Sequence, residues 1–156
     1  MKIFKNTSIS KNYKNSVLAI GNFDGIHIGH KKVLKAAFKK AKKLKKKFGL
    51  LTFEPVPVMF FNKKIKNHRI NSYIQKKEQL KKYKIDFLIN IKFNKLFSLI
   101  KAEQFINGVI FKKTKTKFIF VSKNFKFGNK RKGNVKLLKK FGEKYNYRLL
   151  KINPFK

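Results

Sequence analysis

The residues of this chain with the clearest capacity for chemistry lie in one short segment. Residues 21–30 read Gly-Asn-Phe-Asp-Gly-Ile-His-Ile-Gly-His. Gly21 and Gly29 let the backbone pass close to a ligand, and His27 and His30 share one face if a helix begins there. A helix N-terminus offers unpaired N–H groups and positive potential to an anion. The segment therefore predicts a cradle for a polyphosphate, with two imidazoles beside it.

The same segment has competing interpretations. It lacks the Gly-Lys-Ser/Thr of a Walker loop and the Gly-x-Gly-x-x-Gly of a dinucleotide fingerprint, so a different nucleotide chemistry is indicated. A zinc site built from Asp24, His27 and His30 is one alternative, and two ordinary loop histidines are another. The chain contains no Cys, and its third histidine, His68, is far along the chain in a polar stretch. We therefore expect no metal site formed by the protein itself.

The elements that must position this segment alternate between strand and helix. Short apolar runs predict strands, and apolar residues at helical spacing between lysines predict helices. We expect an α/β fold, a Rossmann-like doubly wound parallel sheet of about five strands, with ligands at the carboxyl ends of the strands near the point where the strand order reverses. The expected strands are 17–21, 50–53, 87–91, 118–121 and 148–152; the expected helices are 31–48 with Gly49 as its stop, 72–84 with a capping box at Ser72, 102–111 and 134–145; and 55–69 is expected to be a loop.

Composition limits the class of protein. The chain has 156 residues, 42% of them hydrophobic, which is enough for the core of a single domain over residues 1–156. The absence of Cys is compatible with a cytoplasmic protein, which we expect. No apolar run is long enough to span a membrane. Lys and Arg number 42 against 6 Asp and Glu, a formal net charge of +36. This charge is consistent with a solvated lysine-rich surface, and also with nonspecific binding of nucleic acid or another polyanion at low salt.

Four stretches together support a more specific interpretation. Residues 21–30 resemble the His-x-Gly-His nucleotidyltransferases, and most closely the FMN adenylyltransferase domain of bacterial riboflavin kinase/FAD synthetases. Residues 52–57 (Thr-Phe-Glu-Pro-Val-Pro), 102–105 (Ala-Glu-Gln-Phe) and 121–128 (Val-Ser-Lys-Asn-Phe-Lys-Phe-Gly) resemble further motifs of that family in the same order. The chain departs from the family pattern at Val56, where the family usually has His, and at Ser122, where it usually has Gly.

The resemblance implies an enzyme that transfers AMP from ATP to FMN, giving FAD and pyrophosphate, with Mg²⁺ offsetting charge and no protein nucleophile. It implies that His27 and His30 hold the phosphates of ATP and stabilise the α-phosphoryl group as pyrophosphate leaves. The other ATP-binding residues would be Gly21, Asn22, Phe23, Asp24 and Gly29. The FMN side of the cleft would be formed by Thr52, Glu54, Pro55, Pro57, Asn124, Phe125, Phe127 and Arg131.

The resemblance also bears on the extent of the protein. The family's domain continues to an Ile-Ser-Ser-Thr-x-Ile-Arg motif and is joined to a riboflavin kinase domain, and neither is in this sequence. We therefore expect residues 1–156 to be a C-terminally truncated FMN adenylyltransferase domain. The alternatives are another His-x-Gly-His nucleotidyltransferase, such as a cytidylyltransferase or a pantetheine-phosphate adenylyltransferase, and a basic nucleic-acid-binding module. Residues 129–132 are equally consistent with a phosphate contact and with an ordinary surface turn.

Overall fold

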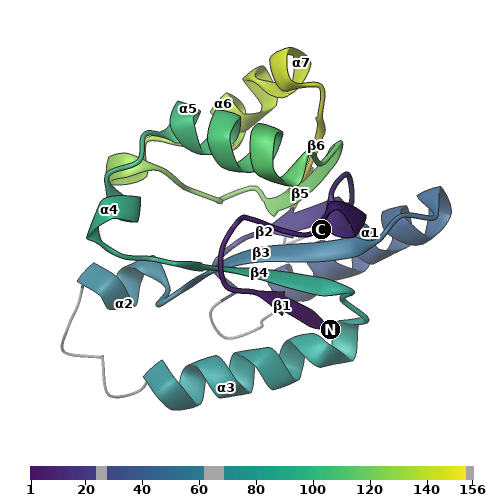
Figure 1. Ribbon diagram of the computed structural model, residues 1–156, viewed down its shortest axis with the longest axis horizontal. Coiled ribbons are helices and arrows are strands. Elements are labelled where there is room, and N and C mark those ends of the chain that lie inside the picture. The colour runs from purple at the N-terminus through teal and green to yellow at the C-terminus, as the bar shows by residue number, and fades with distance from the viewer. Residues whose placement is uncertain (24–27, 62–68, 154–156) are drawn as a thin grey trace.

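One parallel β-sheet of six strands forms the centre of the molecule (Figure 1). The computed structural model describes residues 1–23, 28–61 and 69–153. Its strands are β1 (Lys2–Phe4), β2 (Val17–Ile20), β3 (Phe48–Glu54), β4 (Phe87–Lys92), β5 (Phe118–Ser122) and β6 (Arg148–Ile152). They lie in the order β1-β4-β3-β2-β5-β6, and each neighbouring pair is parallel. The predicted parallel sheet is confirmed.

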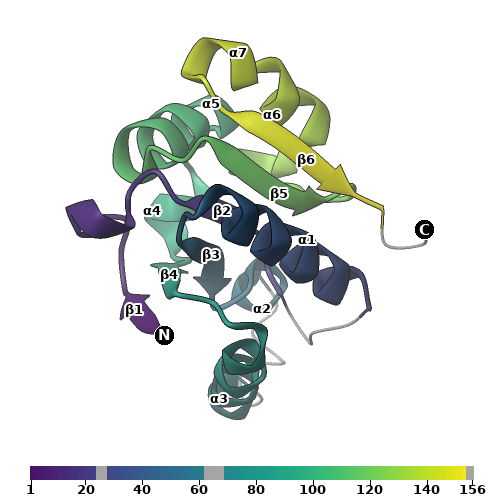
Figure 2. The ribbon, with the colours of Figure 1, turned by 90° about the vertical axis from the view of Figure 1, so that its right-hand side faces the viewer.

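Helices cover both faces of this sheet, so the fold is doubly wound as expected (Figures 1 and 2). The helical segments are η1 (Lys11–Tyr13), α1 (Ile28–Leu44), α2 (Pro57–Phe61), α3 (Arg69–Leu80), η3 (Lys81–Tyr83), α4 (Lys95–Ser98), α5 (Ala102–Gln104), the π-helix η4 (Phe105–Thr114), η5 (Asn129–Arg131), α6 (Val135–Lys140) and α7 (Gly142–Tyr145). Apolar residues of α1 and α3 pack on one face. Those of α5, η4, α6 and α7 pack on the other. No helix within the described ranges combines the length and apolarity needed to cross a bilayer.

Strand β3 shows how the two faces are built. Leu50 belongs to the core cluster beneath α1, and Leu51 belongs to the cluster on the opposite face. Because successive side chains of a strand point to opposite faces, a strand covered on both sides has an apolar residue at nearly every position. The continuous run of buried residues from Phe48 to Phe53 therefore reflects a central strand.

The C-terminal end of α1 differs from the prediction. The expected helix over 31–48 is wrong at its end: α1 stops at Leu44, and Lys45 takes a left-handed φ of 56°. Phe48 begins β3, where it is the register partner of Val17. Gly49 lies inside the strand and is no helix stop: a Cβ there would lie 2.1 Å from the Phe87 ring. Strand pairing and a close ring contact override the helical spacing of the sequence.

Other element boundaries also differ. Residues 57–61 form α2 within the segment expected to be a loop, and α3 begins at Arg69, so a capping box at Ser72 cannot start it. The helix predicted over 102–111 extends as a π-helix to Thr114, and the one predicted over 134–145 is divided into α6 and α7. Strand β1 was not predicted, because three residues are too few to show a pattern.

The strand order reverses at β2. From β2 the chain proceeds to β3 and β4 on one side, and it later returns to place β5 on the other side of β2. The segments that follow β2 and β5 therefore flank the reversal point at the carboxyl ends of the strands. In open α/β sheets this crevice is where ligands bind.

Candidate functional site

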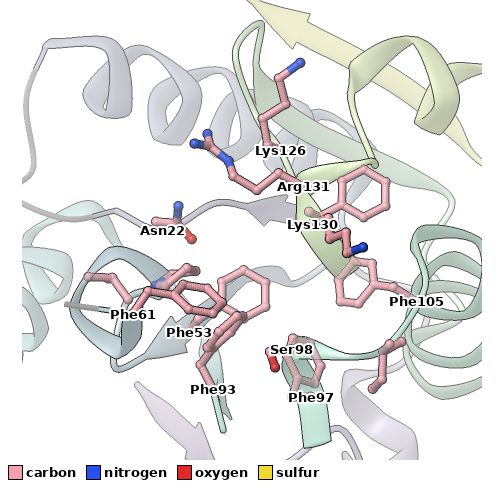
Figure 3. A pocket seen from close by; sticks show the side chains of 15 residues that line it. Asn22, Phe53, Phe61, Phe93, Phe97, Ser98, Phe105, Lys126, Lys130 and Arg131 are labelled. Carbon is pink, nitrogen blue, oxygen red and sulfur yellow. The ribbon is translucent and has the colours of Figure 1, made fainter. Parts of the chain in front are cut away.

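A cavity of about 470 Å³ opens at this carboxyl edge (Figure 3). Small-molecule sites commonly have volumes of roughly 300–1,000 Å³. The lining comes from the end of β3, from the segments after β2, β3, β4 and β5, and from η4. Its residues are Asn22, Phe53, Val56, Pro57, Phe61, Phe93, Phe97, Ser98, Ile100, Phe105, Lys126, Phe127, Gly128, Lys130 and Arg131.

Phenylalanine rings form a continuous wall of the cavity. The Phe97 ring centroid lies 5.7 Å from that of Phe53, 5.6 Å from that of Phe93 and 6.1 Å from that of Phe105. Phe105 in turn lies 5.4 Å from Phe127. Such edge and tilted contacts are the arrangements that aromatic pairs prefer. The wall offers apolar ring faces and edges to a ligand, which suits a flat aromatic group.

The position of Phe97 on this wall follows from a helix cap. Asn94 accepts a hydrogen bond from the Phe97 backbone N–H at 2.8 Å through its side-chain Oδ1. It is the N-cap of α4, a single short turn that carries Phe97 and Ser98 into the lining. Asparagine is among the residues that best satisfy the free N–H groups of a first helical turn. This cap therefore orients two lining residues.

The opposite edge of the cavity is cationic. Lys126, Lys130 and Arg131 line it, and no Asp or Glu is among the described residues of the lining. The turn that carries Lys130 and Arg131 is closed by two backbone hydrogen bonds, from the Phe127 N–H to the Gly133 carbonyl at 3.1 Å and from the Gly133 N–H to the Phe127 carbonyl at 2.8 Å. Figure 3 shows Lys126 and Arg131 on this side and the rings of Phe53, Phe93 and Phe97 across from them.

The segment after β2 leads from the sheet to the predicted phosphate cradle. Gly21 donates its N–H to the Leu51 carbonyl at 3.1 Å. Phe23 is fully buried with φ 50°, and its ring centroid lies 5.0 Å from that of half-buried His30. His30 and buried Gly29 belong to the first turn of α1, as the cradle requires. Asp24 and His27 lie outside the described residues.

The structure brings some of the predicted flavin-side residues together and separates others. Pro57, Phe127 and Arg131 line the cavity, together with Asn22 from the predicted ATP segment. The remaining five are absent from the described lining: Thr52, Glu54, Pro55, Asn124 and Phe125.

Each of these five has another place in the fold. Thr52 is buried and hydrogen-bonds with the side chain of Lys76 on α3, on the face of the sheet opposite Phe53. Phe125 is buried and stacks on Phe127, with ring centroids 5.4 Å apart, whereas Asn124 is exposed. Pro55 is buried and Glu54 half-buried. None of these five is a lining residue of this cavity, and their predicted contacts with FMN stay a prediction.

Sequence reasoning missed most of the aromatic wall. The lining residues that the sequence did not indicate include Phe53, Phe61, Phe93, Phe97, Phe105 and Lys126, whereas Lys130 belongs to the 129–132 turn considered for a phosphate contact. The chain has 18 Phe, and at helix or strand spacing each is also consistent with an ordinary core position. A usable signal is that Phe93 directly follows the end of β4 and Phe97 lies in the short helix after it, at the edge where ligands bind.

The arrangement can hold a flat apolar ring system joined to a phosphate, beside a helix N-terminus suited to a second phosphate group. Among the described residues, no group of three or more His, Cys, Asp or Glu is positioned to hold a metal ion. These residues do not include Asp24 and His27, so the expectation that the protein supplies no metal site stays a prediction.

Known proteins resemble this chain both in fold and in sequence. The fold and the cavity at the strand-order reversal define a doubly wound α/β protein with a ligand site at the carboxyl ends of its strands. Similar folds occur in the crystal structures of a macrolide-efflux protein from Streptococcus pneumoniae (TM-score 0.76, 22% identity, 97% of this chain and 49% of that chain) and of a pantoate-beta-alanine ligase from Francisella tularensis (TM-score 0.57, 16% identity, 98% and 67%). At such identities the likeness establishes the fold alone. Residues 9–156 match the FAD synthetase family, and the chain belongs to that family.

Curated relatives carry the double name bifunctional riboflavin kinase/FMN adenylyltransferase. The protein from Buchnera aphidicola subsp. Schizaphis graminum is 40% identical over 146 residues, 94% of this chain and 47% of that protein. The one from Buchnera aphidicola subsp. Acyrthosiphon pisum is 38% identical over 99% of this chain and 50% of its own length, and that from Escherichia coli K12 is 30% identical over 89% and 44%. The chain thus spans about half the length of these relatives.

Proposed function

We propose that this chain transfers AMP from ATP to FMN, releasing FAD and pyrophosphate. A phosphate oxygen of FMN attacks the α-phosphorus of ATP, and the bond from that phosphorus to the oxygen bridging to the β-phosphate breaks. No covalent intermediate with the protein is needed. The rate then depends on how the two substrates are aligned and on how charge is stabilised. Mg²⁺ bound to the phosphates of ATP would offset their charge.

One observation supports the proposal above the others: Asn22 belongs to both halves of the site. Its side chain lines the aromatic cavity, and it is the second residue of the segment predicted to hold the ATP phosphates (Figure 3). A flavin ring held among the phenylalanines would therefore have its phosphate chain next to that segment. The cationic edge formed by Lys130 and Arg131 suits the FMN phosphate.

The histidines complete the proposed chemistry. His30, in the first turn of α1, and His27 would donate hydrogen bonds to phosphate oxygens as the negative charge of pyrophosphate develops. The N-terminus of the 17-residue helix α1 adds positive potential at the same place.

The test is direct. The purified chain is incubated with FMN, ATP and Mg²⁺, and FAD and pyrophosphate are measured by chromatography, with riboflavin in place of FMN in a parallel reaction. We expect FAD and pyrophosphate in equal amounts from FMN and neither from riboflavin. The His30→Ala variant should lose at least about 100-fold in rate. The matched control is Lys35→Ala, an exposed position five residues further along the helix, which should keep the wild-type rate.

The alternatives give different results in the same assay. Another His-x-Gly-His nucleotidyltransferase would release pyrophosphate with a different phosphate acceptor or with CTP, and it would leave FMN unchanged. The absence of FAD above the level of an enzyme-free blank would overturn the proposal for this chain. We further propose that residues 1–156 correspond to the adenylyltransferase half of a longer cytoplasmic protein whose other half is a riboflavin kinase domain.

A second activity, binding of nucleic acid, is favoured by the surface of α1. Within its 17 residues this helix has no Asp or Glu, and five of its lysines are exposed: Lys31, Lys35, Lys39, Lys42 and Lys43. Positions 31, 35 and 39 follow one another at intervals of four residues, which aligns them along one face of the helix. Such a stripe attracts a phosphate backbone without reading its sequence.

A further inference from the structure

Lys76 is a buried cation that the proposed chemistry has not yet used. It lies on α3, and only 7% of it is exposed. Its Nζ donates a hydrogen bond to the Asn22 backbone carbonyl at 2.6 Å and another to Thr52 Oγ1 at 2.9 Å. The Thr52 hydroxyl itself donates to the same Asn22 carbonyl at 3.0 Å. We call these three residues the Asn22 clamp.

The clamp is costly to maintain for stability alone. Lysine is almost never buried unless it is paired, because its ammonium group must give up water. Exposed positions for lysine are plentiful on the same segment: Lys81 and Lys82 follow α3 in η3 and face solvent. The burial of Lys76 is therefore better explained by what it holds.

Lys76 holds Asn22, the residue at which the aromatic cavity and the predicted phosphate segment meet. The backbone carbonyl of Asn22 is held from the face of the sheet covered by α3, while its side chain lines the aromatic cavity (Figure 3). The next residue, Phe23, has a left-handed φ of 50° and packs on His30. The direction in which the chain leaves β2 toward His30 thus depends on the peptide group that the clamp fixes.

We propose that Lys76 is a positioning residue for AMP transfer, acting through Asn22. It fixes the backbone between the flavin cavity and the phosphate segment, so that the two substrates meet in line. This inference rests on the proposed function. Lys76 is not a lining residue of the cavity, so its loss should affect alignment and nucleotide binding far more than flavin binding. Small misplacements of reacting groups lower rates steeply, by roughly 100-fold for about 1 Å.

The test compares Lys76→Met with Lys77→Met in the full chain. Methionine keeps the length and apolar stem of lysine and removes the charge. Lys77 is the next residue on α3, with its Nζ 5.5 Å from the Tyr73 ring centroid, so both variants lose one charge from one helix. We expect Lys76→Met to lower kcat at least about 10-fold, with the flavin Kd changed less than about 3-fold, and Lys77→Met to leave both unchanged.

Thr52 provides an independent check on the same carbonyl. Thr52→Ser keeps the hydroxyl and should retain most of the rate, whereas Thr52→Val removes it and should lower kcat in the manner of Lys76→Met. Because Lys76 and Thr52 act on one group, the double variant Lys76→Met/Thr52→Val should lose clearly less than the product of the two single losses.

Three results would overturn the inference. The first is an equal rate for Lys76→Met and Lys77→Met. The second is a parallel loss of flavin affinity, thermal stability and rate in Lys76→Met, which would indicate a purely structural role. If the wild type makes no FAD, the proposed function fails separately, and Lys76 is then judged on ATP binding measured by calorimetry. ATP binding at least about 10-fold weaker in Lys76→Met than in Lys77→Met supports the positioning role. Equal ATP affinities of the two variants are the third overturning result.

Discussion

Gly128 lies directly against Ala102, so closely that a Cβ on Gly128 would be 2.7 Å from the Ala102 Cα and 2.8 Å from its backbone nitrogen. Gly128 also has a φ of 78°, in the left-handed region that favours glycine. The neighbouring Asn129 donates its N–H to the Ile100 carbonyl at 2.8 Å. The turn that carries the cationic edge of the cavity is thus attached to the start of α5, and this contact sets the position of Lys130 and Arg131.

Gly128→Ala should therefore weaken both the fold and the site. Strain at positive φ and the clash with Ala102 together should cost about 1–3 kcal/mol of unfolding free energy, measured by urea denaturation. FMN affinity should fall in the same variant, because the turn must move away from α5. Gly108→Ala is the control: a Cβ there meets nothing within 4 Å. A Gly128→Ala protein as stable as the Gly108→Ala protein would contradict this account.

The aromatic wall predicts a loss of flavin affinity when Phe97 is truncated. Phe97→Ala removes the ring that contacts Phe53, Phe93 and Phe105, and it should weaken riboflavin and FMN binding alike, by at least about 10-fold. Quenching of flavin fluorescence measures both constants. Phe111→Ala is the matched control, because Phe111 is 42% exposed, contacts Tyr145 and is not part of the lining. Equal effects of the two truncations would exclude the wall as the flavin site.

The cationic edge predicts a selective effect on the phosphate. Arg131→Gln removes a charged donor from the lining and should weaken FMN binding by about 10- to 100-fold, while riboflavin, which has no phosphate, binds as before. Lys132→Gln changes the charge next to it at an exposed position outside the lining and serves as the control. A similar loss of riboflavin affinity in Arg131→Gln would show that Arg131 does not bind the phosphate of FMN.

The lysine stripe of α1 predicts binding that depends on salt. Lys31, Lys35, Lys39 and Lys43 are replaced by Gln, and binding of a labelled single-stranded RNA is measured by fluorescence anisotropy. The plot of log association constant against log salt concentration should become less steep, its slope smaller in magnitude by about 2–3. The control replaces four exposed lysines away from α1, namely Lys101, Lys112, Lys113 and Lys115, and has the same net charge. If both variants bind RNA identically, total charge explains the binding and α1 forms no interface.

Tyr147 predicts a loss of stability at alkaline pH. Burial, with a smaller contribution from Tyr145, raises the pKa of Tyr147 above its ordinary value of 10.0. Its hydroxyl donates to the Leu138 carbonyl, which ties α6 to the start of β6. At alkaline pH the folded state therefore keeps this proton, whereas the unfolded chain releases it. The contribution of the Tyr147 hydroxyl to the free energy of unfolding is complete below about pH 10 and declines as pH rises further.

The measurement is the free energy of unfolding between about pH 9 and pH 11. Tyr147→Phe should be less stable than the wild type at pH 9, because it lacks the hydrogen bond, and should show a shallower fall toward pH 11. All other side chains are the same in both proteins, so the difference between the two curves isolates Tyr147. Parallel curves would show that the hydroxyl does not titrate differently in the folded state.

The sequence by itself determines the order of the strands from β2 to β6, and it predicts a phosphate-binding segment at the end of β2. Strands 87–91, 118–121 and 148–152 lie where the apolar runs predict them, because a parallel sheet covered on both faces requires apolar residues at nearly every strand position. The spacing of Gly and His in residues 21–30 indicates a phosphate segment, and Gly29 and His30 do lie in the first turn of α1. These properties depend on neighbouring residues, and local sequence contains them.

Tertiary structure decides which side chains share the site. Thr52 and Phe53 are adjacent in sequence, yet their side chains lie on opposite faces of the strand. Phe53 lines the cavity, and Thr52 belongs to the Asn22 clamp with Lys76. The wall combines Phe53, Phe97 and Phe127, which only the order of β3, β4 and β5 in the sheet brings together. Such contacts depend on packing between distant segments, and no spacing along the chain specifies them.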